Sequence, residues 1–375
     1  MFFRSMAVAL LLVLLLASGA LAFGEWKGSD DPASSLEDLI QRLEADLQRA
    51  GDGHSAHPDF LAALEDYVAE LYEILAAIEG VEESQWGAWS AAEAADIGSR
   101  STQSARGVDL HMRLAPAAVF PIGADDDDHG SVDQNFWIAE TPVTYRSWSA
   151  VVQWAEQSGY VFASAGQPGS GRAVRDDPEE AAPQPVTNIN WRDAVVWCNA
   201  LSEMLGLDPV YRHQGSVIRD AGNEAYDEAE QTVANGFRLP TNEEWELAAR
   251  YQGNDGSGGA LASDGLYWTP GSHASGSSAS VENVRATEAV AWFRQNSDGA
   301  TQPVGTKQAN ALGLFDMSGN VAEWVFTARS ANLRYVRGGH FNDNSDGLAV
   351  GLLRTSSMTR STSGDRGFRV TRTDL

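Results

Sequence analysis

The residues most able to do chemistry are few in this 375-residue chain. Cys198 is the only cysteine, so no internal disulfide can form. It falls on the apolar face of an expected helix, which predicts a buried, inert thiol rather than a nucleophile. The acidic run from Asp125 to Asp128, followed by His129, could bind a cation, although such runs are more typical of solvated loops.

The segment 340–366 is the stronger candidate for binding. It combines small polar side chains with interspersed arginines, which suit adaptable hydrogen bonding to a ligand. The alternative is an ordinary polar surface, with Arg354 and Arg369 in structural ion pairs. The candidate ligand-binding residues are His340, Phe341, Asn342, Asp343, Asn344, Asp346, Arg354 and Arg360.

Short elements must position these residues. Helices are expected to begin after Thr144, after Asn190 with Asp193 as its capping partner, and after Thr241 with Glu244 in the same role. Short strands are expected at 120–123 and 136–138. Residues 251–280 are rich in Gly and Ser, so much of the domain must consist of ordered loops whose buried backbone groups need side-chain, water or ion partners.

The N-terminal part has a different character. Residues 1–22 have the pattern of a signal peptide, with a transmembrane anchor as the alternative reading. Residues 23–110 predict a helical region and linker, with a helical hairpin formed by 34–51 and 58–80. Because each helix has one apolar stripe, the hairpin should pack on a partner, on itself in an oligomer, or on the following domain.

Charge and hydropathy narrow the class of partner. The formal net charge is −26, which argues against binding to nucleic acid or to an anionic membrane, because both require clustered Lys and Arg. No stretch after the leader is apolar enough to span a membrane. We therefore expect a periplasmic or secreted protein.

A series of motifs from residue 111 to 375 resembles the formylglycine-generating enzyme (sulfatase-modifying factor) family. The resemblance implies an α+β, loop-rich variant of the C-type-lectin-like fold, preceded here by the helical hairpin. The motifs, in order, are Phe120-Pro121-Ile122-Gly123, Glu140-Thr141-Pro142-Val143-Thr144, the run from Pro185 to Trp191, the run from Gly236 to Glu246, Val290-Ala291-Trp292-Phe293, Gln302-Pro303-Val304-Gly305, the run from Gly313 to Trp324, Arg337-Gly338-Gly339 and Gly367-Phe368-Arg369-Val370.

The resemblance also implies a structural calcium site. Its ligands would be the carboxylates of Asp316 and Glu323 and the backbone carbonyls of Gly319 and Val321, a set of oxygens that suits calcium. The alternative is a turn in which the two carboxylates cap backbone amides. A second site near Asn283, Val284, Asn296 and Asp298 is a weaker possibility.

The catalytic features of the family are missing. Its oxidases use two copper-binding cysteines after the Arg-Gly-Gly motif, where this chain has Asp343 and Leu348 near the corresponding positions. Neither replaces a thiolate, so copper is not expected. Iron-dependent members need a histidine triad, whereas the seven histidines here are scattered without its spacing: His54, His57, His111, His129, His213, His273 and His340.

Three functions remain open. The first is an exported, non-catalytic module that binds a protein, peptide or glycan. The second is a metal-dependent oxidoreductase with an atypical site on the same scaffold. The third is a surface receptor whose C-terminal segment is diversified by a retroelement, because some variable proteins resemble this fold and also end just after Gly-Phe-Arg.

Overall fold

The computed structural model describes residues 97–375 except 172–177, 254–260, 264, 354 and 374–375. The chain divides into two compact units, Met1–Ala95 and Asp96–Leu375. The predicted signal peptide, the helical hairpin and Arg354 therefore lie outside the described residues. Within the described part, no helix is long and apolar enough to cross a membrane.

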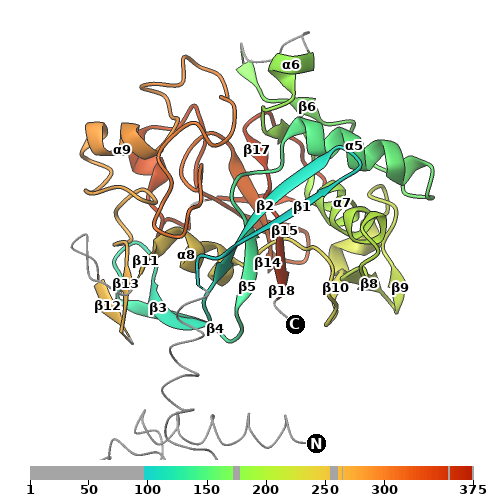
Figure 1. Ribbon diagram of the computed structural model, residues 1–375, viewed down its shortest axis with the longest axis horizontal. Coiled ribbons are helices and arrows are strands. Elements are labelled where there is room, and N and C mark those ends of the chain that lie inside the picture. Colours follow the sequence, from blue (N-terminus) through green and yellow to red (C-terminus); the bar gives the residue numbers. More distant parts are fainter. Residues whose placement is uncertain (1–96, 172–177, 254–260, 264, 354, 374–375) are drawn as a thin grey trace, which may run out of the picture. The chain divides into compact units, whose positions relative to one another are not determined.

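Two four-stranded sheets form the centre of the second unit (Figure 1). The first has the order β1-β2-β5-β18 and is antiparallel throughout. The second has the order β16-β15-β14-β17, in which only the β14–β17 pair is parallel. Their strands are β1 (Arg100–Ala105), β2 (Val108–Ala115), β5 (Phe136–Ala139), β18 (Thr371–Thr373), β14 (Ala322–Ser330), β15 (Leu333–Arg337), β16 (Thr355–Met358) and β17 (Arg366–Gly367).

Smaller sheets and short helices surround this centre. They comprise β3 (Ala118–Ile122) with β4 (Asp128–Val132); β6 (Gln167–Pro168) with β7 (Val186–Thr187); β8 (Tyr211–His213), β9 (Ser216–Val217) and β10 (Glu230–Gln231); and β11 (Tyr251–Gly253), β12 (Leu261–Ser263) and β13 (Leu266–Trp268). The helices are α5 (Tyr145–Glu156), α6 (Pro178–Ala181), α7 (Trp191–Met204), α8 (Asn242–Arg250) and α9 (Val284–Val290), with 3₁₀ turns η2 (Glu224–Glu228) and η3 (Ser345–Leu348). This mixed, loop-rich fold agrees with the expectation from the motifs.

The expected linker up to residue 110 is wrong for its last part. Residues 100–115 form the β1–β2 hairpin, which turns at Arg106 and Gly107, both with positive φ. Val108, Leu110 and Met112 alternate toward the core, as a half-buried strand requires. The Ser-rich β1 lies at the sheet edge, where apolar side chains are not needed, and its composition therefore resembled a linker.

The three expected helix starts are confirmed. Thr144 caps α5 through Ser147, and Asn190 and Asp193 form a reciprocal capping box at α7. Thr241 and Glu244 do the same at α8. These caps satisfy amide groups that a helix leaves unpaired at its first turn.

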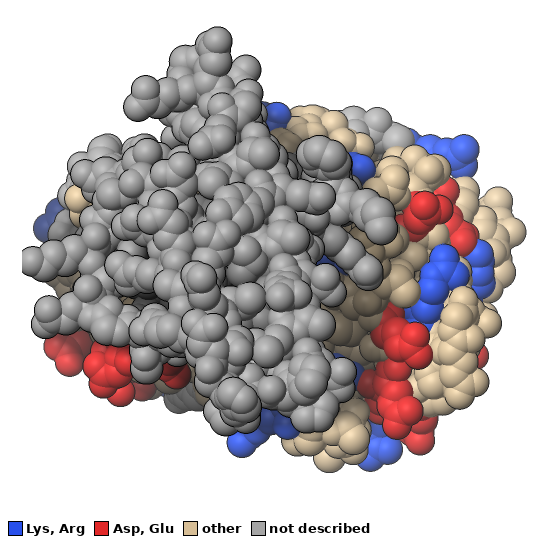
Figure 2. Space-filling view, turned by 90° about the horizontal axis from the view of Figure 1, so that it is seen from below, with Lys and Arg blue, Asp and Glu red and all other residues tan. Residues whose placement is uncertain are grey.

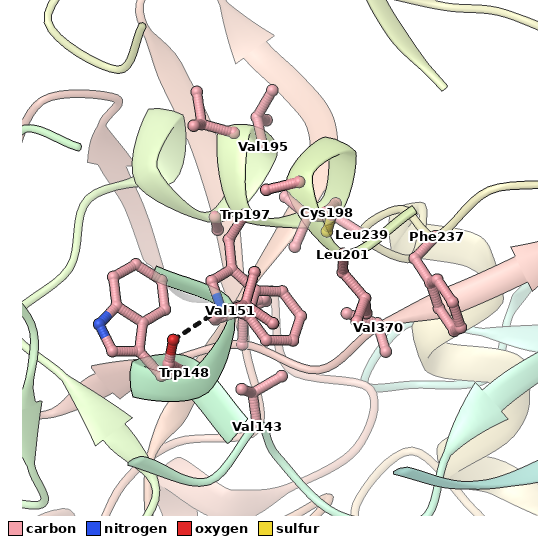
Figure 3. Close-up of a cluster of buried hydrophobic side chains, with 14 of the residues drawn as sticks. Val143, Trp148, Val151, Val195, Trp197, Cys198, Leu201, Phe237, Leu239 and Val370 are labelled. Carbon is pink, nitrogen blue, oxygen red and sulfur yellow. Dashed lines mark hydrogen bonds between the residues drawn. The ribbon is translucent and has the colours of Figure 1, made fainter. Parts of the chain in front are cut away.

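Aromatic side chains join α5 and α7 to the closing motif. Trp148 and Trp197 stack with ring centroids 6.3 Å apart, and Phe368 meets both edge-on. Figure 3 shows this cluster, in which Trp197 Nε1 donates a hydrogen bond to the backbone oxygen of Trp148. Cys198 is fully buried here, and burial raises the pKa of its thiol. The structure thus confirms the expected burial of this cysteine.

Buried carboxamide side chains form hydrogen bonds with backbone groups in loops and at the ends of short strands. Asn199 accepts from the amide of Tyr211 and donates to the carbonyls of Tyr211 and Ile218. Asn310 accepts from the amides of Leu312 and Leu314. These fixed carboxamides replace the hydrogen bonds that regular strands would otherwise supply.

The acidic loop also has a structural task. Asp126 accepts from the guanidinium of the fully buried Arg250 at 2.5 Å and from the amide of Gly271. The solvated-loop interpretation is therefore wrong for Asp126, although Asp125, Asp127 and Asp128 are exposed. The sequence could not reveal a buried arginine that is distant along the chain.

Candidate functional site

Two neighbouring segments contain the predicted site residues. The first, residues 313–323, leads into β14, and the second, residues 340–366, runs from the end of β15 to β17. Backbone contacts connect them, because Phe341 donates its amide hydrogen to Asn320 and Gly319 donates to Gly338. The geometry of each segment decides which chemistry it can support.

Glu323 is the centre of a buried ion pair. Its Oε1 and Oε2 accept hydrogen bonds of 2.7 Å each from Nη2 and Nε of Arg369. Its Oε2 also accepts from Trp245 Nε1 at 2.8 Å. Because both charged side chains are almost fully buried, the guanidinium balances the charge of Glu323.

Asp316 has a different environment. Its Oδ2 accepts from the amide of Gly305 at 2.7 Å, whereas the buried Oδ1 has no partner among the described residues. Burial raises the pKa of Asp316 to about 6, and the charge of Glu323 adds to this rise, although the Gly305 amide, Arg369 and the Asn320 side chain act in the opposite direction. Asp316 is therefore the carboxylate in this segment that lacks full compensation.

These contacts test how well the residues fit calcium. Asp316 fits, because an unpaired buried oxygen is available and its backbone takes the left-handed conformation in the turn. Gly319 has φ +79°, and an added Cβ would lie 2.3 Å from the carbonyl oxygen of Trp292. Glu323 fits less well, because Arg369 already neutralises its charge.

The weaker second calcium position uses its oxygens locally. Asn283 caps α9 by accepting from the amide of Ala286. The Oδ1 atom of Asn296 accepts from the amide of Phe293. Asp298 has a positive φ, but no contact in the described structure joins it to these two side chains.

His340 lies at the centre of the second segment. Its Nδ1 accepts from the amide of Asn342, which places the proton of a neutral ring on Nε2. Nε2 lies 3.4 Å from a carboxylate oxygen of Asp343 and 3.6 Å from one of Asp365. Asp343 also accepts from the His340 amide, so its carboxylate is held in place.

The two positions that correspond to catalytic cysteines have separate environments. Asp343 is half-buried in the His340 cluster. Leu348 is fully buried and packs in a cluster that includes Val290 and Phe293. One position therefore carries a carboxylate that contacts the amide and the ring of His340, and the other carries an aliphatic core residue.

The other predicted ligand-binding residues separate into exposed and buried groups. Asn342, Asn344 and Asp346 are exposed, whereas Phe341 is buried. Arg360 is exposed and lies 3.9 Å from Glu224 on η2, so its nearest charged partner belongs to another segment.

Sequence reasoning missed Asp365 and Arg294. Arg294 donates to the carbonyl oxygen of Asn342 and to Oδ1 of Asn344, and thereby holds the exposed loop. The only available signal was position, because Asp365 directly precedes the Arg366–Gly367 strand and Arg294 directly follows the Trp292-Phe293 pair.

A family model for the sulfatase-modifying factor enzyme 1-like domain matches residues 109–374. The chain belongs to this family. It lacks the cysteine pair of the formylglycine-generating oxidases, since Cys198 is its single cysteine and lies in the core.

Individual proteins agree with this assignment. The chain is similar to Treponema denticola variable protein 1, with 28% identity, a TM-score of 0.56 and coverage of 73% of this chain and 99% of that one. It is similar to the crystal structure of CarF, with 30% identity, a TM-score of 0.57 and coverage of 71% and 99%. A chaperone protein LppX from Paenibacillus barcinonensis is 33% identical over 165 residues, 38% of this chain and 51% of LppX. The chain thus spans about half the length of that curated relative.

Proposed function

We propose that this member of the sulfatase-modifying factor family is an exported, non-catalytic module that binds a protein or peptide through the surface of segment 340–366. The observation that carries the proposal is the pair Asp343 and Leu348. A carboxylate held by His340 and a leucine inside the core supply no thiolate for copper.

The exposed loop supports a binding role. Asn342 and Asn344 present polar groups to solvent, while Arg294 fixes the backbone between them. An ordered loop with exposed carboxamides can bind with little loss of conformational entropy. The description of LppX as a chaperone belongs to that protein, but it favours a protein or peptide partner over a glycan here.

Catalysis is tested with the purified protein loaded with copper and a Cys-x-Pro-x-Arg peptide. We expect no aldehyde by mass spectrometry. Formation of formylglycine above the level of a copper-only control would overturn the proposal.

Binding is tested by selecting from a displayed random-peptide library. Selected peptides should lose binding to the Asn342→Ala, Asn344→Ala double variant and retain it with Asp125→Asn, which changes an exposed residue elsewhere. Equal binding to both variants would place the interaction outside this surface.

We further propose a structural calcium ion at Asp316, with the carbonyl oxygens of Gly319 and Val321 and any remaining acceptor capacity of Glu323. The unpaired Oδ1 of Asp316 supports this ligand set. Calcium should raise the melting temperature relative to EDTA in the wild-type protein and not in Asp316→Asn. An equal rise in both proteins would exclude Asp316 as a ligand.

A second candidate is the retroelement-diversified receptor. The similarity to Treponema denticola variable protein 1 favours this candidate, because the match covers 99% of that chain. The exposed loop of segment 340–366 could change without disturbing the core beneath it. The neighbouring DNA decides the matter: a reverse-transcriptase gene and a near-identical repeat of the C-terminal coding segment are expected, and the absence of both excludes this candidate.

A further inference from the structure

Arg192, in the first turn of α7, carries a buried guanidinium with unused hydrogen-bond donors. The residue is 5% exposed, and its Nε and Nη1 atoms have no hydrogen-bond partner among the described residues. The guanidinium faces the carboxylate of Asp227, whose Oδ1 lies 3.6 Å from Nε and is itself buried without a hydrogen bond. Because buried polar groups are normally hydrogen-bonded, this ion pair leaves both partners poorly satisfied.

A second buried arginine contacts the same residue. Arg334, on β15, is 4% exposed, and its Cζ atom lies 4.2 Å from the ring centroid of Trp191. Its Nη2 donates to the backbone oxygen of Asp227, whereas its Nε is buried without a partner among the described residues. Burial lowers the pKa of this guanidinium, and the negative charge of Asp227 opposes that change. Both arginines therefore converge on Asp227.

The charges around Asp227 do not balance. Among the described residues, Asp227 provides the only side-chain ion pair of Arg192, and Arg334 forms none. Two guanidiniums thus share one carboxylate with a single negative charge. A doubly charged oxyanion would balance both arginines, and its several oxygens would accept from both planar guanidiniums.

A surface turn presents Asp227 to the two arginines. The turn is η2, which lies between β9 and β10 and contains no buried residue. Its exposed Glu224 lies 3.9 Å from the exposed Arg360. The side chain of Asp227 is 18% exposed, so it reaches solvent as well as Arg192. Rotation of this side chain toward solvent would uncover the nitrogen atoms of Arg192 without displacing a core residue.

The side of the unit that carries β8, β9 and β10 has charges of both signs. It lies at the right of Figure 2, where acidic and basic side chains are next to one another. The net charge of −26 disfavours a large anionic surface as a partner. A small dianion in direct contact with two arginines is less affected, because solvent and salt screen the more distant exposed charges.

We infer that a doubly charged oxyanion, either inorganic phosphate or a phosphomonoester group, binds Arg192 and Arg334 in the place of the Asp227 carboxylate. Asp227 is then an internal competitor, since its carboxylate must turn away before the ligand enters. The exchange replaces an ion pair without side-chain hydrogen bonds by charge-assisted hydrogen bonds to both arginines. The site does not use Asn342 or Asn344, so it can fail while the proposed peptide binding stands.

The probes are inorganic phosphate, glycerol 3-phosphate and dimethyl phosphate. Each is titrated calorimetrically into the full chain at pH 7.5 and constant ionic strength, with EDTA present. The first two are mainly dianions at this pH and should bind at least about tenfold more tightly than the monoanion dimethyl phosphate. Binding of both dianions indicates a phosphomonoester site, and binding of inorganic phosphate alone indicates a site for the free ion.

Two matched variants of η2 test the competition. Asp227→Asn removes the charge that opposes the ligand and should tighten phosphate binding about tenfold. Glu224→Gln removes one negative charge from the same turn, but this side chain is 75% exposed and faces Arg360. It should change the affinity less than about twofold, because exposed charges are screened.

A double variant separates binding from a structural role. Asp227→Asn alone leaves Arg192 without its carboxylate, so the melting temperature should fall and phosphate should restore it. Adding Arg192→Met removes the buried charge as well. The double variant should melt higher than Asp227→Asn in the absence of phosphate, and it should lose phosphate binding.

The outcomes are decisive. Preference for dianions, tighter binding by Asp227→Asn and its loss in the double variant support the site. The inference is overturned if phosphate does not bind the wild-type protein or if dimethyl phosphate binds equally well. It is also overturned if Asp227→Asn and Glu224→Gln change the affinity equally, or if the double variant still binds phosphate.

Discussion

Segments 313–323 and 340–348 lie against each other but use charged side chains in opposite ways. In the first, Glu323 and Arg369 are matched in the interior, with side-chain exposures of 1% and 0%. In the second, His340 and Asp343 remain 22% and 26% exposed and meet at 3.4 Å. The first arrangement joins two distant segments in the interior, and the second leaves polar groups within reach of a ligand.

This contrast changes the meaning of the family motifs. The Gly313–Trp324 run and the closing Gly-Phe-Arg motif meet in one buried network, since Arg369 also donates to the carbonyl oxygens of Ala139 and Phe315. Such a network specifies the packing of distant segments whether or not catalysis occurs. Strong motifs therefore identify the scaffold, while the proposed binding function relies on the more exposed segment.

The largest effect should come from breaking the buried pair. Glu323→Gln leaves the Arg369 guanidinium uncompensated in the core and should lower the free energy of unfolding by about 3–5 kcal/mol, as measured by urea denaturation. The matched control is Glu224→Gln, whose residue faces Arg360 at 3.9 Å and is 75% exposed. That change should cost less than about 1 kcal/mol. Equal costs would refute the distinction between the two regions.

Leu348→Ala tests the buried end of the second segment. The side chain is fully buried against Val290 and Phe293, so its truncation should cost about 2–5 kcal/mol in the same assay. Leu348→Met, which nearly conserves volume, is the control and should cost less than about 1.5 kcal/mol. A negligible cost for Leu348→Ala would mean that this position is open and could accept a functional group.

Asp316 should give the stability a distinct pH dependence. Burial raises its pKa to about 6 in the folded state, above the value of about 3.9 in an unfolded chain. The folded state therefore holds the proton more tightly, and this contribution to stability is present below pH 4 and lost as pH rises through 6.

In EDTA, the stability of the wild type relative to Asp316→Asn should accordingly fall by about 2 kcal/mol between pH 4.5 and 7.5. Urea denaturation of both proteins at the two pH values measures this difference. Calcium should restore the loss at pH 7.5 and have little effect at pH 4.5, because a ligating carboxylate must be deprotonated. A difference that does not change with pH would show that Asp316 titrates normally.

The sequence predicted much of the fold because local signals were strong. The caps at Thr144, Asn190 and Thr241 lie within one turn of the residues they bind, so spacing alone indicates them. The β1–β2 hairpin was missed because the edge strand carries Ser and Gln rather than apolar residues. The hairpin joins the sheet because β2 pairs with β5, which is distant along the chain.

The candidate site was less accessible to prediction. Asp343 and Asp365 meet at His340 only because the chain returns at β17, and no spacing rule connects positions so far apart. The pairing of Glu323 with Arg369 likewise joins two motifs that were recognised separately. Residue types indicated which groups could act, but tertiary packing decided which were already paired.

The smallest expected effect on stability concerns Asp343, whose side chain is partly exposed in segment 340–348. Asp343→Ala removes the acceptor of the His340 amide and one partly exposed contact with the His340 ring, which should cost about 1 kcal/mol or less. Asp343→Asn keeps an acceptor oxygen and should cost still less. Urea denaturation measures this variant together with Leu348→Ala. Because Asp343 and Leu348 are five residues apart in sequence, the two free energies of unfolding compare positions within one segment. If Asp343→Ala proved as costly as Leu348→Ala, the His340 cluster would belong to the core, and its exposure could not be taken as a sign of binding.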